Sequence, residues 1–267
     1  MNDHELDAYA PPRIAELVES VGVKKAQLPA LQTVVLGMLA GAFIAFGAML
    51  FTLVMTDPGS LGVGLHRWVG GIAFSLGLVL VVVAGAELFT GNNLIVMAWV
   101  SGRITASDLL RNWLLVFLSN FAGALGCVVL MAATGLLSSS LAGVGATAQT
   151  IAEAKLALPA EQAFARGILC NVLVCLAVWM SVASRRISGK VLAVVFPVSA
   201  FVALGFEHSI ANMYLIPVGM LLEYGHIDWF ALFSNLLPVT AGNIIGGAGF
   251  VAAVYWVIYL RGSGDEV

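Results

Sequence analysis

One histidine and two glutamates lie within strongly apolar stretches of the sequence, where ionisable side chains are rare. Of the four histidines, only His208 lies inside such a stretch, and the two glutamates are Glu87 and Glu207. Charged groups at membrane depth are costly and are therefore functional candidates by default. An unperturbed imidazole titrates near pH 6.5, so small environmental shifts let it hold or pass a proton at working pH. His208 is the first candidate for the chemistry of this chain.

Both glutamates lie in short polar segments that interrupt an apolar run. The first segment reads GAELFTGNN at residues 85–93, and the second reads GFEHSIAN at residues 205–212. Backbone that is broken at membrane depth must be buried in protein or line a wet cavity, and the N-terminus of the half-helix that follows favours a nearby anion. For the two glutamates, direct proton relay is the alternative to a capping role, and the alternative for the interruptions as a whole is a pair of kinked helices with structural polar caps. The side chains that we expect to cap the broken backbone are Glu87, Asn92, Glu207 and Asn212.

The composition indicates that these segments belong to a membrane protein. Apolar residues make up 60% and charged residues 10% of the 267 residues, whereas soluble domains have about 45–50% and about 25%. This balance excludes a soluble globular enzyme, a disordered chain and a nucleic-acid-binding protein. We expect an all-α fold with six transmembrane helices, because an apolar helix needs about 20 residues to cross a bilayer. The six apolar blocks are residues 26–66, 68–102, 112–152, 167–184, 191–222 and 229–260.

The ends of the chain and the basic residues predict its organisation and orientation. Residues 1–29 are polar, which opposes a signal peptide, and the apolar spacing across Pro12–Val23 predicts a short amphipathic helix. If both termini are cytoplasmic, nine of the 12 Lys and Arg residues lie on the inner side, as the positive-inside rule expects. We therefore expect a cytoplasmic segment at 1–29, a six-helix membrane domain at 30–261 and a cytoplasmic tail at 262–267.

The two halves of the chain, about residues 25–134 and 155–261, show weak self-similarity. Each half holds three spans, an odd number, so the two halves must enter the membrane from opposite sides. Folds built in this way place the pathway near the midplane, where interrupted helices meet. The matches pair Lys25 and Gly37 with Lys155 and Gly167, Gly85, Glu87 and Asn92 with Gly205, Glu207 and Asn212, and Gly102, Ile104, Asn112, Asn120 and Gly123 with Gly225, Ile227, Asn235, Asn243 and Gly246.

Further candidates flank the two interruptions. Lys25 and Lys155 precede the first span of each half, so the inversion places them at opposite mouths, where they would form a basic lead-in for anions. The large apolar side chains beside the breaks either pack the core or form hydrophobic constrictions on a pore axis. The three cysteines lack the spacing of zinc ligands, and we expect neither a metal nor a cofactor. The constriction candidates are Phe74, Leu78, Phe89 and Phe201.

Five sequence stretches resemble the formate/nitrite transporter family, and within it the formate channels most closely. They are ELFTGNN at 87–93, SGRIT at 101–105, NVLVCLAVWMS at 171–181, GFEHSIANMYLIPVGM at 205–220 and NLLPVTAGNIIGG at 235–247. The resemblance runs from the predicted amphipathic helix to YWVIYLR at 255–261, which is essentially the whole chain. It implies an aquaporin-like protomer with an inverted repeat and two broken helices, assembled as a homopentamer with one pore per protomer in a bacterial inner membrane.

The resemblance also implies roles for residues at matching positions. His208 is similar to the central pore histidine of the family, Thr90 to the threonine that faces it, and Asn171 to an asparagine that lines the same vestibule. The four constriction candidates and the two lysines match constriction and anion-attracting positions. One departure is GNN at 91–93, where many formate channels carry small hydroxyl or aliphatic residues. This departure leaves the choice between formate and nitrite open.

The expected function is passive or proton-linked movement of a small monovalent anion, with formate the first candidate substrate. A bare anion crosses an apolar constriction at high cost, and a proton or a hydrogen bond from His208 would lower that cost. Protons and membrane lipid are the other expected partners, whereas nucleic acid is not expected. A nitrite or hydrosulfide channel is the alternative within the family. Outside it, an aquaporin-like channel would carry Asn-Pro-Ala at the breaks, and an intramembrane hydrolase would need the adjacent Ser209 and His208 to meet as nucleophile and base.

Overall fold

The computed structural model describes residues 8–261, and this part of the chain is helical without a β-strand. Residues 1–7 and the predicted tail at 262–267 lie outside the described residues. Six helices in the described part are long and apolar enough to cross a membrane, which confirms the predicted number. The elements are α1 (Pro11–Ala26), α2 (Ala30–Thr56), α3 (Val63–Leu80), η1 (Val81–Gly85), η2 (Gly91–Ile95), α4 (Val96–Val100), α5 (Ala106–Ala133), η3 (Leu136–Ser138), α6 (Ala142–Leu156), α7 (Ala160–Ala183), α8 (Ile187–Leu204), α9 (Ser209–Tyr224), α10 (Trp229–Ile244), η4 (Ile245–Ala253) and α11 (Val254–Tyr259).

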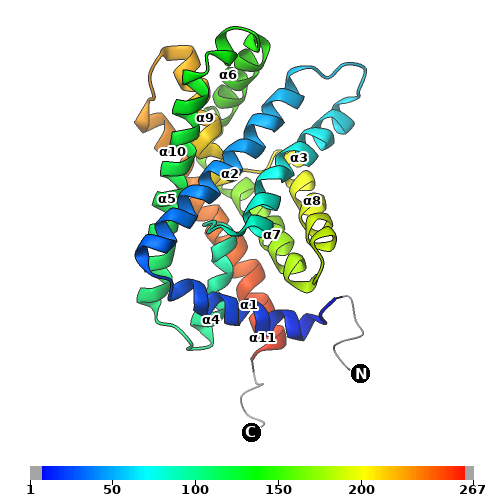
Figure 1. Cartoon of the computed structure of the whole chain (residues 1–267), viewed down its shortest axis with the longest axis vertical. Helices are drawn as coiled ribbons and strands as arrows, with labels where there is room; N and C mark the ends of the chain where they lie inside the picture. Colours follow the sequence, from blue (N-terminus) through cyan, green and yellow to red (C-terminus); the bar gives the residue numbers. More distant parts are fainter. Residues whose placement is uncertain (1–7, 262–267) are drawn as a thin grey trace.

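Two shorter helices lie at opposite ends of the helical bundle (Figure 1). α1 crosses the end at which the described chain also finishes, whereas α6 lies at the far end. The predicted amphipathic helix is confirmed as α1, which buries Ile14 and Val18. α6 was not predicted as a separate helix. The charge-free block 112–152 in fact holds most of α5, a turn at Gly135 with φ of 67° and much of α6.

The inverted repeat predicted from the sequence is present in space. α2 packs against α3 and α5, and in the second half α7 packs against α8 and α10 in the same way. The glycines that the repeat pairs also share backbone conformations. Gly85 and Gly205 have φ of 84° and 75°, and Gly102 and Gly225 have φ of 72° and 71°. Left-handed backbone favours glycine because a Cβ is strained there, so each half bends at equivalent positions.

Close contact between helix backbones holds each half together. A Cβ on Gly123 of α5 would lie 2.0 Å from the carbonyl oxygen of Met38 in α2. A Cβ on the repeat-related Gly246 would lie 2.2 Å from the carbonyl oxygen of Ile168 in α7. Only glycine permits this approach, and small residues at helix contacts are typical of membrane bundles, where packing drives helix association.

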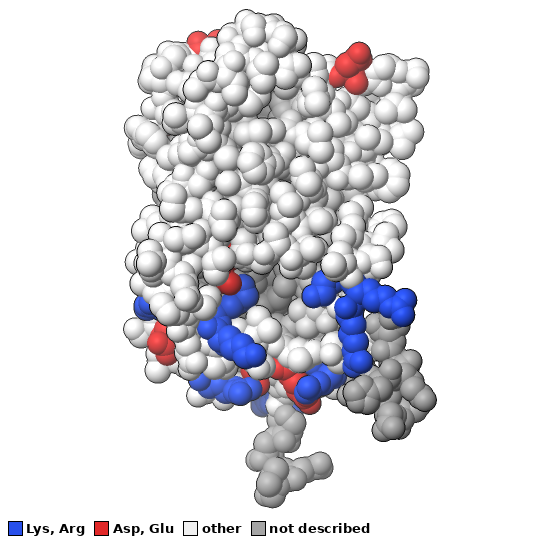
Figure 2. All heavy atoms as spheres, viewed as in Figure 1, with Lys and Arg blue, Asp and Glu red and all other residues white. Residues whose placement is uncertain are grey.

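The outer surface of the bundle is that of a multi-pass membrane protein. Large apolar side chains such as Leu114, Leu130 and Leu237 are 60%, 68% and 69% exposed, which would be unfavourable in water by about 25 cal/mol per Å². Figure 2 shows a wide band without charged side chains and a concentration of Lys and Arg at the α1 end. The uncharged band is suited to contact with lipid chains, and the basic end marks one membrane interface.

Candidate functional site

The two interrupted spans leave the helical path at equivalent points and resume it as half-helices. α3 continues into the π-helical turn η1 and stops at Gly85, and a half-helix resumes over residues 91–100. α8 stops at Leu204, and α9 begins at Ser209 after a short extended segment. Both half-helices therefore start in the interior of the protein. Their N-terminal dipole ends favour negative charge at the place where the two breaks meet.

The backbone freed by each break is bound by an asparagine from the neighbouring span. The Asn120 side chain accepts a hydrogen bond from the Phe89 N–H (2.9 Å) and donates to the carbonyls of Gly37 (2.7 Å) and Glu87 (2.9 Å). Asn243 repeats this pattern in the second half. It accepts from the Ser209 N–H at 2.9 Å, and it donates to the carbonyls of Gly167 at 2.8 Å and Glu207 at 2.9 Å.

This arrangement corrects the prediction that Glu87, Asn92, Glu207 and Asn212 cap the broken backbone. In the described part of the chain, the hydrogen bonds of their side chains go to other side chains instead. For Glu87 and Glu207 the reason is chemical, because a carboxylate can only accept, whereas each break exposes both N–H and C=O groups. For Asn92 and Asn212 the reason is that their N–H donors are used by the neighbouring glutamate and by a second asparagine. A carboxamide donates and accepts together, and it therefore suits both kinds of group.

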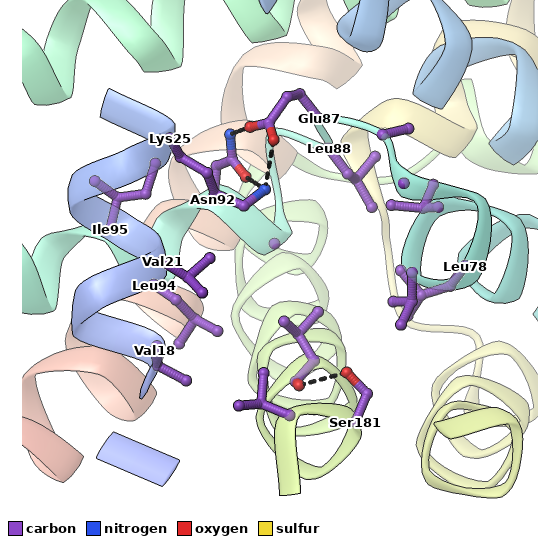
Figure 3. Close-up of a pocket in the computed structure, with 18 of the residues that line it drawn as sticks. Val18, Val21, Lys25, Leu78, Glu87, Leu88, Asn92, Leu94, Ile95 and Ser181 are labelled. Atoms are coloured by element: carbon purple, nitrogen blue, oxygen red, sulfur yellow. Dashed lines mark hydrogen bonds and ion pairs between the residues drawn. The ribbon is translucent and has the colours of Figure 1, made fainter. Parts of the chain in front are cut away.

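Glu87 instead forms a buried ion pair with Lys25 at the α1 end (Figure 3). The Lys25 ammonium lies 2.8 Å from the Glu87 carboxylate and donates to the side-chain oxygen Oδ1 of Asn92 at 3.0 Å. Asn92 in turn donates to Glu87 at 2.7 Å and to Asn112 at 3.0 Å. Asn112 closes the ring by donating to the Lys25 backbone carbonyl at 3.1 Å. The network fixes α1 and α5 to the first break.

Most of this network recurs around the second break, built from the residues that the sequence repeat pairs but without a hydrogen bond from the lysine to the asparagine. Lys155 donates to both carboxylate oxygens of Glu207 at 2.9 Å. Asn212 donates to Glu207 at 2.7 Å and to Asn235 at 2.8 Å, and Asn235 donates to the Lys155 carbonyl at 2.9 Å. The two lysines expected at the mouths are therefore each paired with a carboxylate. Because each pair is neutral overall, the lysines add no net positive charge for the expected anion lead-in.

Thr90 and His208 meet between the two breaks. The Thr90 Oγ1 lies 2.9 Å from His208 Nε2, and both residues are buried. His208 is also the N-cap of α9, because its Nδ1 accepts the Ala211 backbone N–H at 3.1 Å. A nitrogen that accepts carries no proton, so the neutral ring bears its proton on Nε2 and donates it to Thr90. The Thr90 hydroxyl hydrogen is then left for another acceptor.

Asn171 supports this meeting point from α7. Its amide nitrogen donates to the carbonyls of Thr90 at 3.2 Å and Asn243 at 2.7 Å. The side chain is fully buried and lines neither of the two vestibules described below. The expectation that Asn171 lines a vestibule is therefore corrected, because its amide nitrogen is used to hold the backbone of the first break against that of α10.

Two vestibules approach this centre from opposite ends of the bundle. The one at the α1 end, the α1 vestibule, has a volume of about 410 Å³ and includes Lys25, Leu78 and Leu88 in its lining (Figure 3). The other, the α6 vestibule, has a volume of about 200 Å³ and reaches Phe74 and His208. Phe74 and Leu78 are one helical turn apart on α3. Adjacent turns of α3, roughly 6 Å apart along the helix axis, therefore face different vestibules.

The apolar side chains of the barrier between the vestibules are arranged nearly as predicted. Phe74 meets Phe201 edge to face with ring centroids 5.9 Å apart, and Phe201 stacks on the His208 ring at 6.0 Å. Leu78 faces the α1 vestibule. Phe89 does not line either vestibule; its ring packs against Trp113 and Phe117 of α5.

The correction at Phe89 follows from the local backbone. Residues 86–88 are not helical, and successive side chains of an extended segment point to opposite sides. Leu88 therefore faces the α1 vestibule, where Figure 3 places it, and its neighbour Phe89 faces α5. Within residues 8–261 no group of three His, Cys, Asp or Glu side chains could hold a metal ion.

Several residues of the site were not predicted from the sequence. Four asparagines of the networks and breaks were identified in the sequence only as repeat matches. The sequence signal that could have assigned them to the site is that each pairs with an asparagine in the other half. The charged residues Arg67, Arg166 and Lys190 line the vestibules and gave no motif signal. The unpredicted network residues are Asn112, Asn120, Asn235 and Asn243.

Comparison with known proteins finds similarity to one family over nearly the whole chain. The model of the formate/nitrite transporter family matches residues 12–257. The formate channel FocA of Escherichia coli (strain K12) is 41% identical over 277 residues, covering 97% of each protein, and a probable formate transporter of Methanothermobacter thermautotrophicus is 42% identical over 269 residues, covering 94% of this chain and 97% of the relative.

Two solved structures share the fold. A pentameric formate channel with formate bound superposes with a TM-score of 0.79 at 38% identity, over 86% of this chain and 98% of that chain. An FNT family ion channel superposes with a TM-score of 0.82 at 30% identity, over 92% of this chain and 98% of that chain.

Proposed function

This chain belongs to the formate/nitrite transporter family, and we propose that it carries formate, as the anion or together with a proton, across the bacterial inner membrane. The observation that carries the proposal is the Thr90–His208 hydrogen bond of 2.9 Å, which lies where two half-helices begin and between two opposed vestibules. Relatives named as formate channels support formate as the substrate. The protein would act as a transporter and not as an enzyme.

The hydrogen-bond directions at the centre suit a small oxyanion. His208 donates from Nε2 to Thr90, so the Thr90 hydroxyl can donate onward to a formate oxygen. Because the α9 N–H of Ala211 holds Nδ1, the ring cannot rotate without losing its cap bond. The positive ends of both half-helix dipoles also stabilise the anion. These contacts replace part of the hydration that formate loses in the barrier, where desolvation otherwise costs several kcal/mol.

Proton-linked transport follows from the same geometry. A formate that receives a proton at the centre crosses the phenylalanine and leucine side chains as a neutral acid, without the cost of moving a charge through them. The proton would come from the solution in the vestibule and not from the neutral His208 ring, because loss of the Nε2 proton would leave an imidazolate. His208, which lines the α6 vestibule, and Thr90 would orient the formate by hydrogen bonds while it takes up this proton. The residues that would form the barrier are Phe74, Leu78, Leu88 and Phe201.

The proposal extends to assembly and orientation. The pentameric relative with formate bound supports a homopentamer with one pathway in each protomer. The concentration of Lys and Arg at the α1 end supports placement of that end in the cytoplasm, by the positive-inside rule. Both ends of the described chain would then lie on the cytoplasmic side.

Uptake of radiolabelled formate into proteoliposomes tests the proposal, measured at pH 5.5 and 7.5 with nitrite and hydrosulfide as competitors. We expect saturable formate entry that empty vesicles lack and that rises at the lower pH. Free passage of nitrite or hydrosulfide without formate entry would move the function to another branch of the family. If no small anion crosses at either pH, the proposed function is wrong.

A further inference from the structure

The charges that line the two vestibules do not come from the lysines alone. In the α6 vestibule, Lys155 is neutralised by Glu207 at 2.9 Å, whereas Arg67 and Arg166 also line the cavity. Within residues 8–261 neither arginine side chain forms an ion pair or a side-chain hydrogen bond. The α6 vestibule therefore holds two uncompensated positive charges.

We propose that Arg67 and Arg166 form an anion-binding site in the α6 vestibule for a small planar oxyanion such as a monocarboxylate. The proposal deepens the proposed function, on which it rests for the identity of the transported anion. It also changes the expectation for this mouth, since the arginines and not Lys155 supply its net positive charge.

The two arginines reach the cavity from different spans. Arg67 lies in the first turns of α3, and Arg166 lies in the second turn of α7. The guanidinium of Arg67 extends over the end of α8, where a Cβ on Gly205 would lie 2.7 Å from its Nη2. The absence of a Cβ at Gly205 therefore leaves room for this guanidinium beside the segment that leads to His208.

The surroundings favour a local binding site over long-range attraction. The rim at the α6 end carries exposed carboxylates, which repel an approaching anion. The lining of the vestibule includes one carboxylate, that of Glu207, and Lys155 pairs with it. The attraction of an anion to this vestibule therefore comes at short range from the two arginines, of which Arg67 is exposed and Arg166 is half-buried. The exposed rim residues are Asp57, Glu153, Glu161, Glu223 and Asp228.

The chemistry of the side chains sets the class of ligand. A guanidinium offers two parallel N–H donors that match the two oxygens of a carboxylate or of nitrite. Hydrosulfide and chloride have one acceptor atom and gain only the charge. The opposite α1 vestibule has Lys190 as its uncompensated cation, because Lys25 pairs there with Glu87. The α6 vestibule is therefore the one suited to select planar oxyanions.

Protection from chemical modification tests binding without relying on transport. Phenylglyoxal modifies Arg67 and Arg166 of the purified protein, and mass spectrometry measures the modification rate at each residue, with the exposed Arg261 at the α1 end as the control. We expect formate to slow modification of Arg67 and Arg166 at least about twofold relative to sodium chloride of equal ionic strength, and to leave Arg261 unchanged. Equal rates in formate and in chloride would overturn the proposal.

Transport kinetics give the second readout. The Ser140→Cys variant places a thiol in the exposed loop before α6. An impermeant biotin maleimide labels this thiol only when it faces outward, whereas the native cysteines are buried. Capture of the labelled vesicles therefore isolates those with the α6 vestibule outward. On this side we expect Arg67→Gln and Arg166→Gln each to raise the KM for formate about threefold to tenfold, and Arg261→Gln to leave it unchanged. Arg67→Lys and Arg166→Lys should raise the formate KM but spare that of hydrosulfide.

The two readouts separate this proposal from the proposed function. Protection of the arginines without formate uptake would keep the anion site and reject formate transport. Formate uptake with an unchanged KM in folded Arg→Gln variants and no protection would keep transport and reject the site. Size-exclusion chromatography of each variant establishes that it is folded before either measurement.

Discussion

Loss of the Lys155 ammonium should destabilise the protein much more than a surface charge change would. The Lys155 and Glu207 side chains are 15% and 5% exposed, so Lys155→Met leaves the carboxylate buried with Asn212 as its remaining side-chain donor at 2.7 Å. Methionine is similar in length and apolar volume, and it leaves no large cavity. Removing one partner of a buried ion pair costs about 3–5 kcal/mol.

The double variant Lys155→Met/Glu207→Gln isolates the cause. Glutamine retains a carbonyl oxygen for Asn212 but carries no charge, so the remaining loss is that of a hydrogen bond, about 1 kcal/mol. For a chain of this size, 1 kcal/mol shifts the thermal midpoint by roughly 2–4 °C. We therefore expect Lys155→Met to lower the midpoint by roughly 6–20 °C and the double variant to lower it by roughly 2–4 °C.

Intrinsic tryptophan fluorescence of the purified protein in detergent measures these midpoints. Lys25→Met is the matched comparison in the first half, and its effect should be smaller because the Lys25 side chain is 27% exposed. A Lys155→Met midpoint within about 2 °C of the wild type would refute the reasoning. A double variant as unstable as the single one would also refute it, because the penalty would then not come from an unpaired carboxylate.

Two further perturbations test the centre and the barrier. A Cβ on Gly247 would lie 2.4 Å from the Asn171 amide nitrogen, which donates to the Thr90 carbonyl. Gly247→Ala should therefore lower the stability of the fold by about 1–3 kcal/mol through overpacking and reduce formate uptake severalfold. Gly249→Ala is the control, with open space at its Cβ, and equal uptake by the two variants would count against a supporting role for Asn171. Leu88→Ala should increase urea leakage through the α1 vestibule, whereas Phe89→Leu should lower the thermal midpoint without added leakage; the reverse pattern would contradict the assigned directions.

The positions of the breaks were predictable because a glycine, a carboxylate and an asparagine recur in both halves. Gly85 and Gly205 do have the left-handed backbone that ends each helical path. The partners of the carboxylates were not predictable in the same way. Lys25 and Glu87 are 62 residues apart in the sequence, and Lys155 and Glu207 are 52 apart. The sequence alone does not reveal which distant side chains the packing brings within hydrogen-bond distance.

The directions in which side chains point near the breaks were also not predictable from the sequence. Helical periodicity placed Phe74 and Leu78 on one face of α3, and both residues do lie at the barrier. That periodicity ends at Gly85, so the choice between Leu88 and Phe89 depends on how the extended segment crosses the bundle. Asn120 and Asn243 were visible as repeat partners, but the backbone groups that they bind exist only once the helices are broken.

Formate uptake by His208→Phe proteoliposomes, compared with the wild type at matched protein content, tests the central claim most directly. Phenylalanine keeps the aromatic ring that stacks on Phe201, but it lacks the proton donor to Thr90 and the cap acceptor for Ala211. The account predicts that the folded variant loses most saturable formate uptake. Equal formate flux through the variant and the wild type would contradict it.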